Sequence, residues 1–218
     1  RYTDNFLIVA PGITIRDRLQ VVQPNHPENY YKKRDLLPPD LIGRLTRANI
    51  EIINYHKLMR RKDPNAPSKL GQELLNPDGE NDPFLETPEQ MVSRVCATFG
   101  NSREIIIIND EAHHCYRPRQ DQVSLDQDEK ETVKYESQRA SVWLSGLEAI
   151  EAKIGVKAVY DLSATPSFLK GSGYPEASIF PWVVSDFSLL DALECGIVKI
   201  PRLPVLDNTA RNDDMPMF

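Results

Sequence analysis

Four consecutive isoleucines at positions 105–108 constrain the fold more than any other part of the chain. An unbroken β-branched run of this length is typical of a strand covered on both faces, as in a parallel sheet. Shorter apolar runs predict further strands at residues 6–10, 50–53 and 156–162. Because helical patterns separate these strands, the sequence predicts an α/β domain whose mainly parallel sheet is flanked by helices.

Local signals place helices between the strands and loops around them. The N-cap sequence at residues 87–90 starts one helix, and apolar spacing predicts others over residues 13–22 and 143–154. Asp186 is expected to cap a further helix that stops at Gly196. Segments rich in Pro, Asn, Gly or charge predict a loop, a surface insertion and a second loop at residues 25–39, 61–86 and 118–135.

Composition limits the class of protein. The cysteines, Cys96, Cys115 and Cys195, are odd in number and widely spaced, so they predict neither a disulfide framework nor a CxxC metal pair. A reducing, cytoplasmic setting is therefore expected. No apolar run is long enough for a bilayer span, and the start of the chain lacks a signal-peptide pattern, so no membrane association is expected. The chain is interpreted as an excised fragment.

Charge is unevenly distributed along the chain, whose formal net charge is -6. Residues 1–62 hold 12 Lys or Arg and 6 Asp or Glu, a net charge of +6, whereas the remainder holds 14 against 26, a net charge of -12. This asymmetry is compatible with a local phosphate-binding surface on an acidic protein. Ordinary solvated surface explains the same excess equally well.

An acidic pair, Asp110 and Glu111, follows the isoleucine strand. Functional groups of open parallel sheets collect beyond the carboxyl ends of the strands. Phosphoryl transfer needs one carboxylate that holds magnesium, usually through water, and a second polar group that orients the attacking water. The pair suits those two tasks, although an acidic pair alone is also an ordinary polar strand end.

Two motifs around these strands resemble those of a known family. NDEAHH at residues 109–114 resembles motif II, the DEAH form of the Walker B box, of superfamily-two helicases. Ser163-Ala164-Thr165-Pro166 resembles their motif III, and the gap between the motifs leaves room for one crossover helix. The resemblance implies a RecA-like P-loop NTPase fold.

The resemblance also implies roles for individual residues. Asp110, Glu111 and His113 would be catalytic, and Asp110 would hold Mg²⁺ through water. Ser163 and Thr165 would hydrogen-bond toward His113 or the acidic pair and couple the nucleotide state to strand movement. A plain polar turn is the alternative interpretation of Ser-Ala-Thr.

Nucleic-acid contacts are implied at two other strand ends. Pro11 and Gly12, followed by a helix with Arg16, resemble motif Ia, where a helix N-terminus meets the nucleic-acid backbone. Asn54 and Tyr55 occupy a later strand end, where the resemblance implies that they would contact the nucleic-acid backbone or bases. Arg16 as a solvated helix residue and Tyr55 as a buried, hydrogen-bonded tyrosine remain open alternatives.

A longer set of phrases resembles the restriction subunit of type III restriction enzymes: FLIVAPGITIRDRL, IINYHKL, IINDEAHHCYR, DLSATPSFLKGSGY and FPWVVSDFSLLDALECGIVKIP. This resemblance implies ATP- and Mg²⁺-dependent translocation or unwinding of double-stranded DNA, a modification (methyltransferase) subunit as partner, and an endonuclease domain elsewhere in the polypeptide. It also implies that residues 1–200 form part of the first motor domain and that residues 201–218 form a linker toward a second.

One expected motif is missing, because no GxxxxGK[ST] phosphate-binding loop occurs in the 218 residues. The family would place this loop and its strand before Arg1, and the second motor domain after Phe218. The chain alone is therefore expected to hydrolyse ATP negligibly. Gly171-Ser172-Gly173 lacks the following Lys-Ser or Lys-Thr and predicts only a turn.

Three alternatives follow from the same residues. A nucleic-acid-binding or scaffolding module derived from the helicase fold would keep the acidic motif without catalysis. A metal-dependent nuclease would use Asp110 and Glu111 but lacks a second carboxylate strand and a nearby Lys. A zinc site at His113, His114 and Cys115 is disfavoured, because three consecutive residues cannot converge on one ion without strain.

Overall fold

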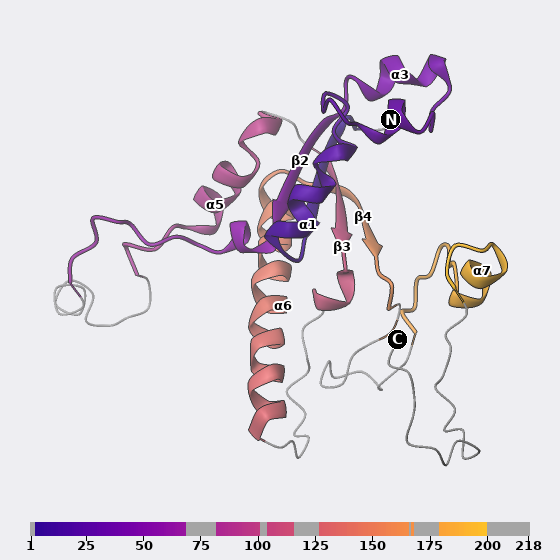
Figure 1. Cartoon of the computed structure of the whole chain (residues 1–218). Coiled ribbons are helices and arrows are strands. Elements are labelled where there is room, and N and C mark those ends of the chain that lie inside the picture. The colour runs from indigo at the N-terminus through magenta and orange to yellow at the C-terminus, as the bar shows by residue number, and fades with distance from the viewer. Residues whose placement is uncertain are drawn as a thin grey trace, which may run out of the picture. The chain divides into compact units, whose positions relative to one another are not determined.

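The computed structural model describes residues 3–68, 82–100, 104–115, 127–165, 167 and 179–199, with only the backbone for residues 127–133 and 136 (Figure 1). The chain divides into two units, residues 1–180 and 181–218, and each is considered by itself.

The first unit is built on a parallel sheet. Within the described residues it has four strands, all parallel, in the order β2-β1-β3-β4. They are β1 (Asn5–Ala10), β2 (Asn49–Asn54), β3 (Ile105–Asp110) and β4 (Val156–Leu162). The predicted α/β architecture with a parallel sheet is confirmed, and each predicted strand is present to within a residue or two.

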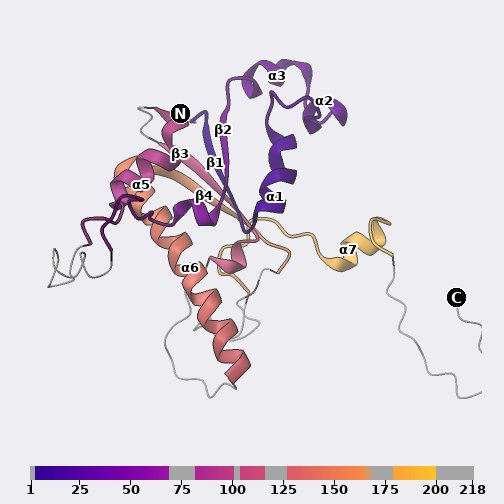
Figure 2. The same ribbon diagram turned by 60° about the vertical axis from the view of Figure 1, so that its left-hand side comes forward.

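Helices cover both faces of the sheet (Figure 2). On one face lies α1 (Ile13–Arg18), which tightens into the 3-10 helix η1 (Leu19–Val22). On the other lie α5 (Pro88–Val95) and α6 (Gln127–Lys153). Right-handed crossovers explain this arrangement, because the chain moves one way from β1 to β2 and the opposite way from β2 through β3 to β4.

Short helices complete the described part of the first unit: α2 (Tyr30–Lys33), α3 (Pro39–Leu45), η2 (Tyr55–Leu58), η3 (Ala97–Phe99) and η4 (Ala112–His114). The prediction of a loop over residues 25–39 is wrong at α2. This helix forms because the Asn29 side chain accepts a hydrogen bond from the backbone N–H of Lys32 (3.1 Å). Pro39 starts α3, at the first helical position where a missing N–H costs nothing.

The start of α6 also differs from prediction. Residues 127–135 are helical rather than part of a loop, whereas residues 118–126 lie outside the described residues. The helix has 27 residues, about 40 Å at 1.5 Å per residue, and extends well past the sheet (Figure 1). The first turns of α6 lie beyond the sheet, so they do not need an apolar face to pack against it. Their sequence, rich in acidic residues with Lys and Gln, therefore resembles a loop, although these residue types favour a helix.

The predicted insertion at residues 61–86 is described only at its base, because residues 69–81 lie outside the described residues. Lys62 and Leu85 form an antiparallel bridge. Arg94 of α5 fastens this base: its guanidinium pairs with the Glu86 carboxylate (2.7 Å) and donates to the carbonyls of Lys57 (3.0 Å) and Met59 (3.1 Å). The pKa of Glu86 is lowered mainly by the hydrogen bond from Arg94.

The second unit contains one described helix, α7 (Leu189–Glu194). Its N-cap is Ser188 rather than the predicted Asp186, because Ser188 and Asp191 form a reciprocal capping box. The helix ends before Gly196, as predicted, where a φ of 70° suits a residue without a side chain. Residues 200–218, which include the predicted linker, lie outside the described residues.

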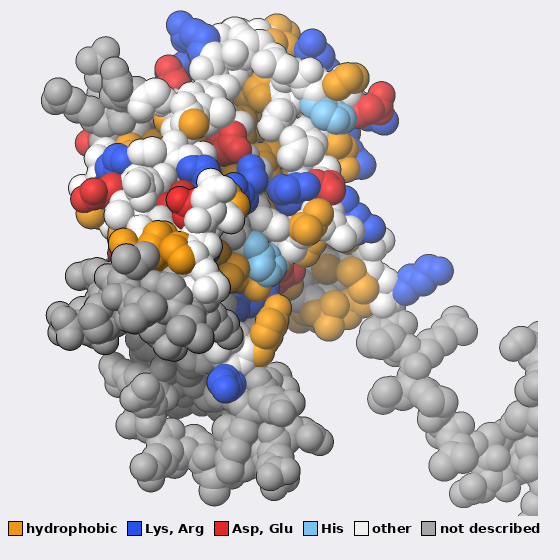
Figure 3. Space-filling model, turned by 90° about the vertical axis from the view of Figure 1, so that its left-hand side faces the viewer, with side chains coloured by type: hydrophobic (Ala, Val, Ile, Leu, Met, Phe, Trp, Pro, Cys, Tyr) orange, Lys and Arg blue, Asp and Glu red, His pale blue; other side chains and the backbone are white. Residues whose placement is uncertain are grey.

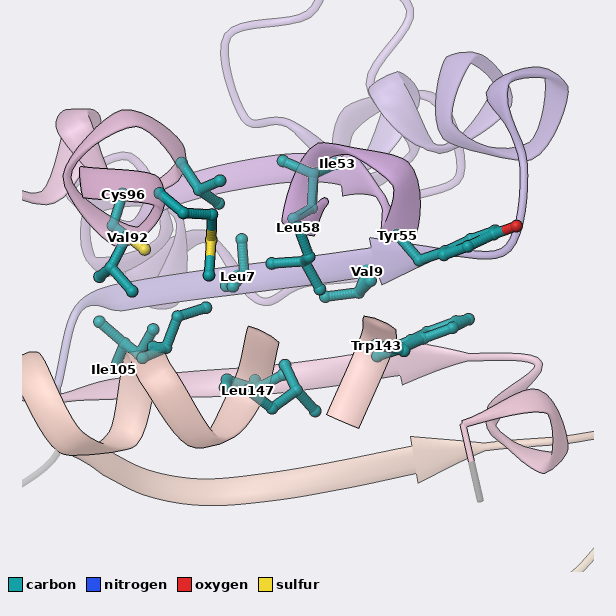
Figure 4. Close-up of a cluster of buried hydrophobic side chains, with 14 of the residues drawn as sticks. Leu7, Val9, Ile53, Tyr55, Leu58, Val92, Cys96, Ile105, Trp143 and Leu147 are labelled. Carbon is teal, nitrogen blue, oxygen red and sulfur yellow. The ribbon is translucent and has the colours of Figure 1, made fainter. Parts of the chain in front are cut away.

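The core of the first unit lies between the sheet and the α5–α6 face (Figure 4). Trp143 and Ile150 of α6 are fully buried against strand residues such as Leu7, Val9 and Ile107. The predicted capping box of α5 is present, with Thr87 and Gln90 exchanging side-chain and backbone hydrogen bonds (2.8 and 3.2 Å). This cap fixes where α5 begins and so which of its residues reach the core.

Gly146 allows α6 to lie close to η2. A Cβ at this position would stand 2.7 Å from the Cβ of Leu58. We expect Gly146→Ala to lower the free energy of unfolding by about 1–3 kcal/mol, because the overlap outweighs the better helix propensity of Ala. Gly43→Ala in α3 is the matched control, since nothing lies within 4 Å of its added Cβ. Urea unfolding followed by circular dichroism compares the two, and equal effects would contradict the steric argument.

Candidate functional site

The carboxyl ends of the strands meet at one edge of the sheet (Figure 1). The register pairs Val9 with Asn109 and Asn109 with Asp161, so the ends of β1, β3 and β4 lie side by side. The direction in which the chain adds strands reverses here. From β1 the chain goes to β2 on one side, and it then returns to the other side of β1 to form β3. Ligand sites of open α/β sheets form in the crevice at such a reversal.

Asp110 is the last residue of β3 and is half-buried at this edge. Burial raises the pKa of its carboxyl group, and the charge of Glu111 raises it further, while a backbone hydrogen bond at Glu111 opposes the shift. The ionised carboxylate is therefore held in a position that disfavours its charge. A cation beside it would offset that cost.

Glu111 turns the chain out of β3 in a left-handed conformation, with φ 51° and ψ 48°. Residues with a side chain rarely adopt this region, and doing so costs of order 1 kcal/mol. The turn starts η4 and leaves the Glu111 side chain 36% exposed. A strained backbone thus separates two neighbouring, partly buried carboxylates.

His113 connects η4 to the end of β4. Its Nδ1 atom lies 2.8 Å from Oγ of Ser163 and 3.5 Å from a carboxylate oxygen of Glu111. Ser163 Oγ also accepts from the backbone N–H of Thr165 (3.0 Å) and donates to the Thr165 carbonyl (3.0 Å). The structure therefore brings together Glu111, His113 and Ser163, with the Thr165 backbone behind them.

Asn109 is a site residue that sequence reasoning missed. It is 1% exposed, accepts a hydrogen bond from Trp143 Nε1 (3.0 Å) and donates to the Asp161 carboxylate (2.8 Å). The only signal in the sequence was a polar side chain at the end of an otherwise apolar strand. Neither partner was identifiable, because one lies 34 residues away on α6 and the other 52 residues away on β4.

The raised pKa of Asp110 predicts the sign of a stability change. A folded pKa above the usual 3.8 means that stability falls as pH rises through the interval between these values. Asp110→Asn should therefore raise the free energy of unfolding at neutral pH, by less than about 1 kcal/mol for a partly exposed group. The gain should vanish below the usual pKa. Unfolding at pH 7 and at acidic pH checks this, with the exposed Asp186→Asn as the charge-matched control. A loss of stability at neutral pH would contradict it.

The residues predicted from motif Ia lie at the end of β1. Gly12 is the N-cap of α1, has extended backbone, and accepts from the N–H of Arg16 (3.0 Å). The Arg16 guanidinium donates to the carboxylate of its neighbour Asp17 at 2.6 and 2.9 Å. Pro11 and Gly12 thus share the sheet edge with Asp110, while Arg16 is engaged in a local ion pair.

Asn54 is the last residue of β2 and Tyr55 the first of η2, and both are buried, at 6% and 4% exposure. The Tyr55 ring stacks on Trp143, with centroids 5.7 Å apart and planes within 2°, and the Arg139 guanidinium lies 5.1 Å from its centroid. Its hydroxyl is 3.5 Å from that of Tyr135. Of the two interpretations of Tyr55, the structure places it as the buried, hydrogen-bonded tyrosine.

Charges of both signs are interspersed on the face that Figure 3 presents. Basic residues of the first third often sit beside acids: Lys33 pairs with Glu28, and Lys57 lies 3.6 Å from Glu51. A basic surface for phosphates therefore stays a prediction.

Thiols and histidines near η4 do not form a metal cluster. Among the described residues, no group of three or more His, Cys, Asp or Glu side chains is arranged to hold a metal ion. Burial, with the charge of Asp161, raises the pKa of the Cys115 thiol to about 12, so it stays protonated and a poor ligand.

No protein-family model, curated protein or solved structure matches the chain. None of the described helices combines the length and apolar character that a membrane span requires.

Proposed function

We propose that the chain is part of the first RecA-like motor domain of an ATP-driven DNA helicase or translocase, of the kind found in the restriction subunit of type III restriction enzymes. The observation that carries this proposal is the contact between His113 Nδ1 and Ser163 Oγ (2.8 Å). It joins the two motif-like segments, which are 50 residues apart, at the carboxyl edge of a parallel sheet. That is where a hydrolysis site and its coupling element need to meet.

The residues at the edge fit a hydrated Mg²⁺ ion. Asp110 offers an oxygen donor, the ligand type that this ion prefers, and its ionised form is disfavoured by burial and by Glu111. Asp110 would hold the ion through water. When bound, Mg²⁺ would neutralise charge that develops on the phosphates during transfer.

The chain's own residues divide the remaining tasks. Glu111, whose side chain is 36% exposed, would orient the attacking water and accept its proton. His113 contacts both Glu111 and Ser163, so it would report a change at the water-orienting residue to the end of β4. Ser163, held by the Thr165 backbone, would transmit that change.

The phosphate-binding half would come from residues outside these 218. Strand β4 forms one edge of the described sheet, and Val159, Tyr160 and Leu162 on it are about half exposed. A fully covered strand would bury such side chains. This exposure supports the proposal that a strand-loop-helix unit carrying the phosphate-binding loop packs beside β4.

The proposed partners are double-stranded DNA and a modification subunit. The basic excess of residues 1–62 and the position of Pro11 and Gly12 at the sheet edge support a phosphate-contacting surface there. Contacts of this kind weaken steeply with salt, so DNA affinity should fall as ionic strength rises.

The test compares two proteins. We expect the full-length protein to hydrolyse ATP faster with duplex DNA than without it, and the 218-residue chain to show negligible hydrolysis in both conditions. Hydrolysis by the full-length protein that is absent, or unchanged by DNA and by RNA, would overturn the motor and favour the non-catalytic module. Stimulation by RNA alone would reassign the nucleic acid.

A further inference from the structure

A polar relay at the carboxyl end of β3 consists of the buried Trp143 and Asn109 and the exposed Asp161. Asn109 of β3 lies at its centre. Its side-chain oxygen accepts a hydrogen bond from the Trp143 indole of α6, and its side-chain nitrogen donates one to the Asp161 carboxylate of β4. Trp143 belongs to none of the segments that carry the family resemblance, whereas Asp161 is the first residue of the segment DLSATPSFLKGSGY. The relay links three elements at the same level of the sheet.

Asparagine is the side chain that these two partners require. The indole N–H needs an acceptor and the carboxylate needs a donor, and one amide supplies both. Leucine would leave the indole N–H without this acceptor, and aspartate would place two carboxylates face to face. Because Asn109 and Trp143 are both buried, water cannot readily replace the hydrogen bond between them, so leaving either group unmet is unfavourable.

The relay fixes the strand end that carries the candidate site. Asn109 directly precedes Asp110, and Asp161 is its register partner, two residues before Ser163. The Asn109–Asp161 bond therefore holds the Asp110 and Ser163 backbones at a set separation. On the other side, Trp143 stacks on Tyr55 at the end of β2, so the relay also reaches the strand end predicted to face nucleic acid.

We propose that Asn109 is a positioning residue for ATP hydrolysis, which sets the Asp110 and Ser163 strand ends relative to each other and to α6. This role rests on the proposed function. Asn109 does not touch the nucleotide or the metal in this scheme. Its loss should therefore lower kcat and leave the KM for Mg-ATP nearly unchanged.

The functional test uses the full-length protein with duplex DNA. We expect Asn109→Leu to lower kcat by about 10- to 100-fold, the scale of a misplaced reacting group, with KM for Mg-ATP within about twofold. Asp161→Asn should stay near the unmodified rate, because its amide oxygen still accepts from Asn109. Asn109→Asp should lower kcat strongly, and Asn109→Asp combined with Asp161→Asn should recover much of it, since the exchanged pair restores acceptor and donor.

A second test uses the 218-residue chain and does not depend on activity. The chain has two tryptophans, and Trp182 is 89% exposed in the other unit, so its indole N–H resonance is an internal reference. We expect the Trp143 indole N–H resonance to shift in Asn109→Leu and to return toward its original position in the exchanged pair, while Trp182 does not move.

The outcomes separate the possible failures. Equal kcat in Asn109→Leu and the unmodified protein, or no recovery in the exchanged pair, would overturn the positioning role while hydrolysis itself stands. Absence of hydrolysis by the unmodified full-length protein would overturn the proposed function and this role with it. A Trp143 indole resonance that does not shift in Asn109→Leu would contradict the hydrogen bond between Trp143 and Asn109. If Asn109→Leu does not fold, Asp161→Ala takes its place in the test, because Asp161 is exposed and this substitution also removes the hydrogen bond between Asn109 and Asp161.

Discussion

Glu111→Gln in the full-length protein should reduce DNA-stimulated ATP hydrolysis by about 100- to 10,000-fold, the usual contribution of a positioned general base. The amide keeps the size of the side chain but cannot accept a proton. In the proposed scheme Mg-ATP binding should persist, because Asp110 is still present to hold the hydrated ion. Steady-state hydrolysis and nucleotide-binding measurements on the same preparation check both parts.

Glu104→Gln is the matched control for this change. Glu104 lies just before β3, at the opposite end of the same strand, and its carboxylate is exposed 3.6 Å from Lys157. The substitution removes the same charge away from the site and should leave the rate within about twofold, as expected for an exposed ion pair. Equal losses of hydrolysis rate in the two variants would contradict a role of Glu111 in the reaction.

Trp143→Ala should destabilise the 218-residue chain by about 3–5 kcal/mol, the usual cost of truncating a buried aromatic residue. Trp143 is fully buried, stacks on Tyr55, and donates a hydrogen bond to Asn109. Its truncation therefore creates a cavity and leaves the buried Asn109 oxygen without this donor. A loss of this size is a large part of the stability of an ordinary domain. Urea and thermal unfolding measure it.

Trp182→Ala is the control for Trp143→Ala, because it deletes the same group from a position that is 89% exposed. Its effect should stay within about 0.5 kcal/mol. If the two substitutions were equally harmful, the core of the first unit would not be organised around α6 as described.

The sheet could be predicted because its signals are local. Four isoleucines in a row permit little besides a buried strand, and the capping sequence at residues 87–90 specifies a helix start by direct contacts. Strand β4 was predicted with its observed bounds, since a glycine precedes it and the sequence Ser-Ala-Thr-Pro follows it. In these segments neighbouring residues determine the structure.

The errors arose where distant contacts or weak patterns decide. The first turns of α6 lack an apolar stripe, so periodicity gave no signal, and α2 depends on one side-chain cap from Asn29. Tyr55 was left open rather than mispredicted: its burial depends on Trp143, 88 positions later in the chain, and a tyrosine hydroxyl can be hydrogen-bonded both inside a protein and at its surface.

The candidate site was partly predictable. The order of the Asp110 and Ser163 segments, each at the end of a strand, suggested that they meet, and His113 and Ser163 are in contact. The amide relay through Asn109 was not predictable, because it depends on the register of β3 against β4 and on which face α6 covers.

Under the proposed function, the left-handed backbone of Glu111 brings the requirements of catalysis and of folding into conflict at a single position. Glycine adopts this conformation without strain and asparagine tolerates it better than most residues, so either would relax the turn. Both would remove the carboxylate. Selection for stability alone would therefore replace Glu111, and its retention in a lineage would be a sign that the turn is maintained for catalysis.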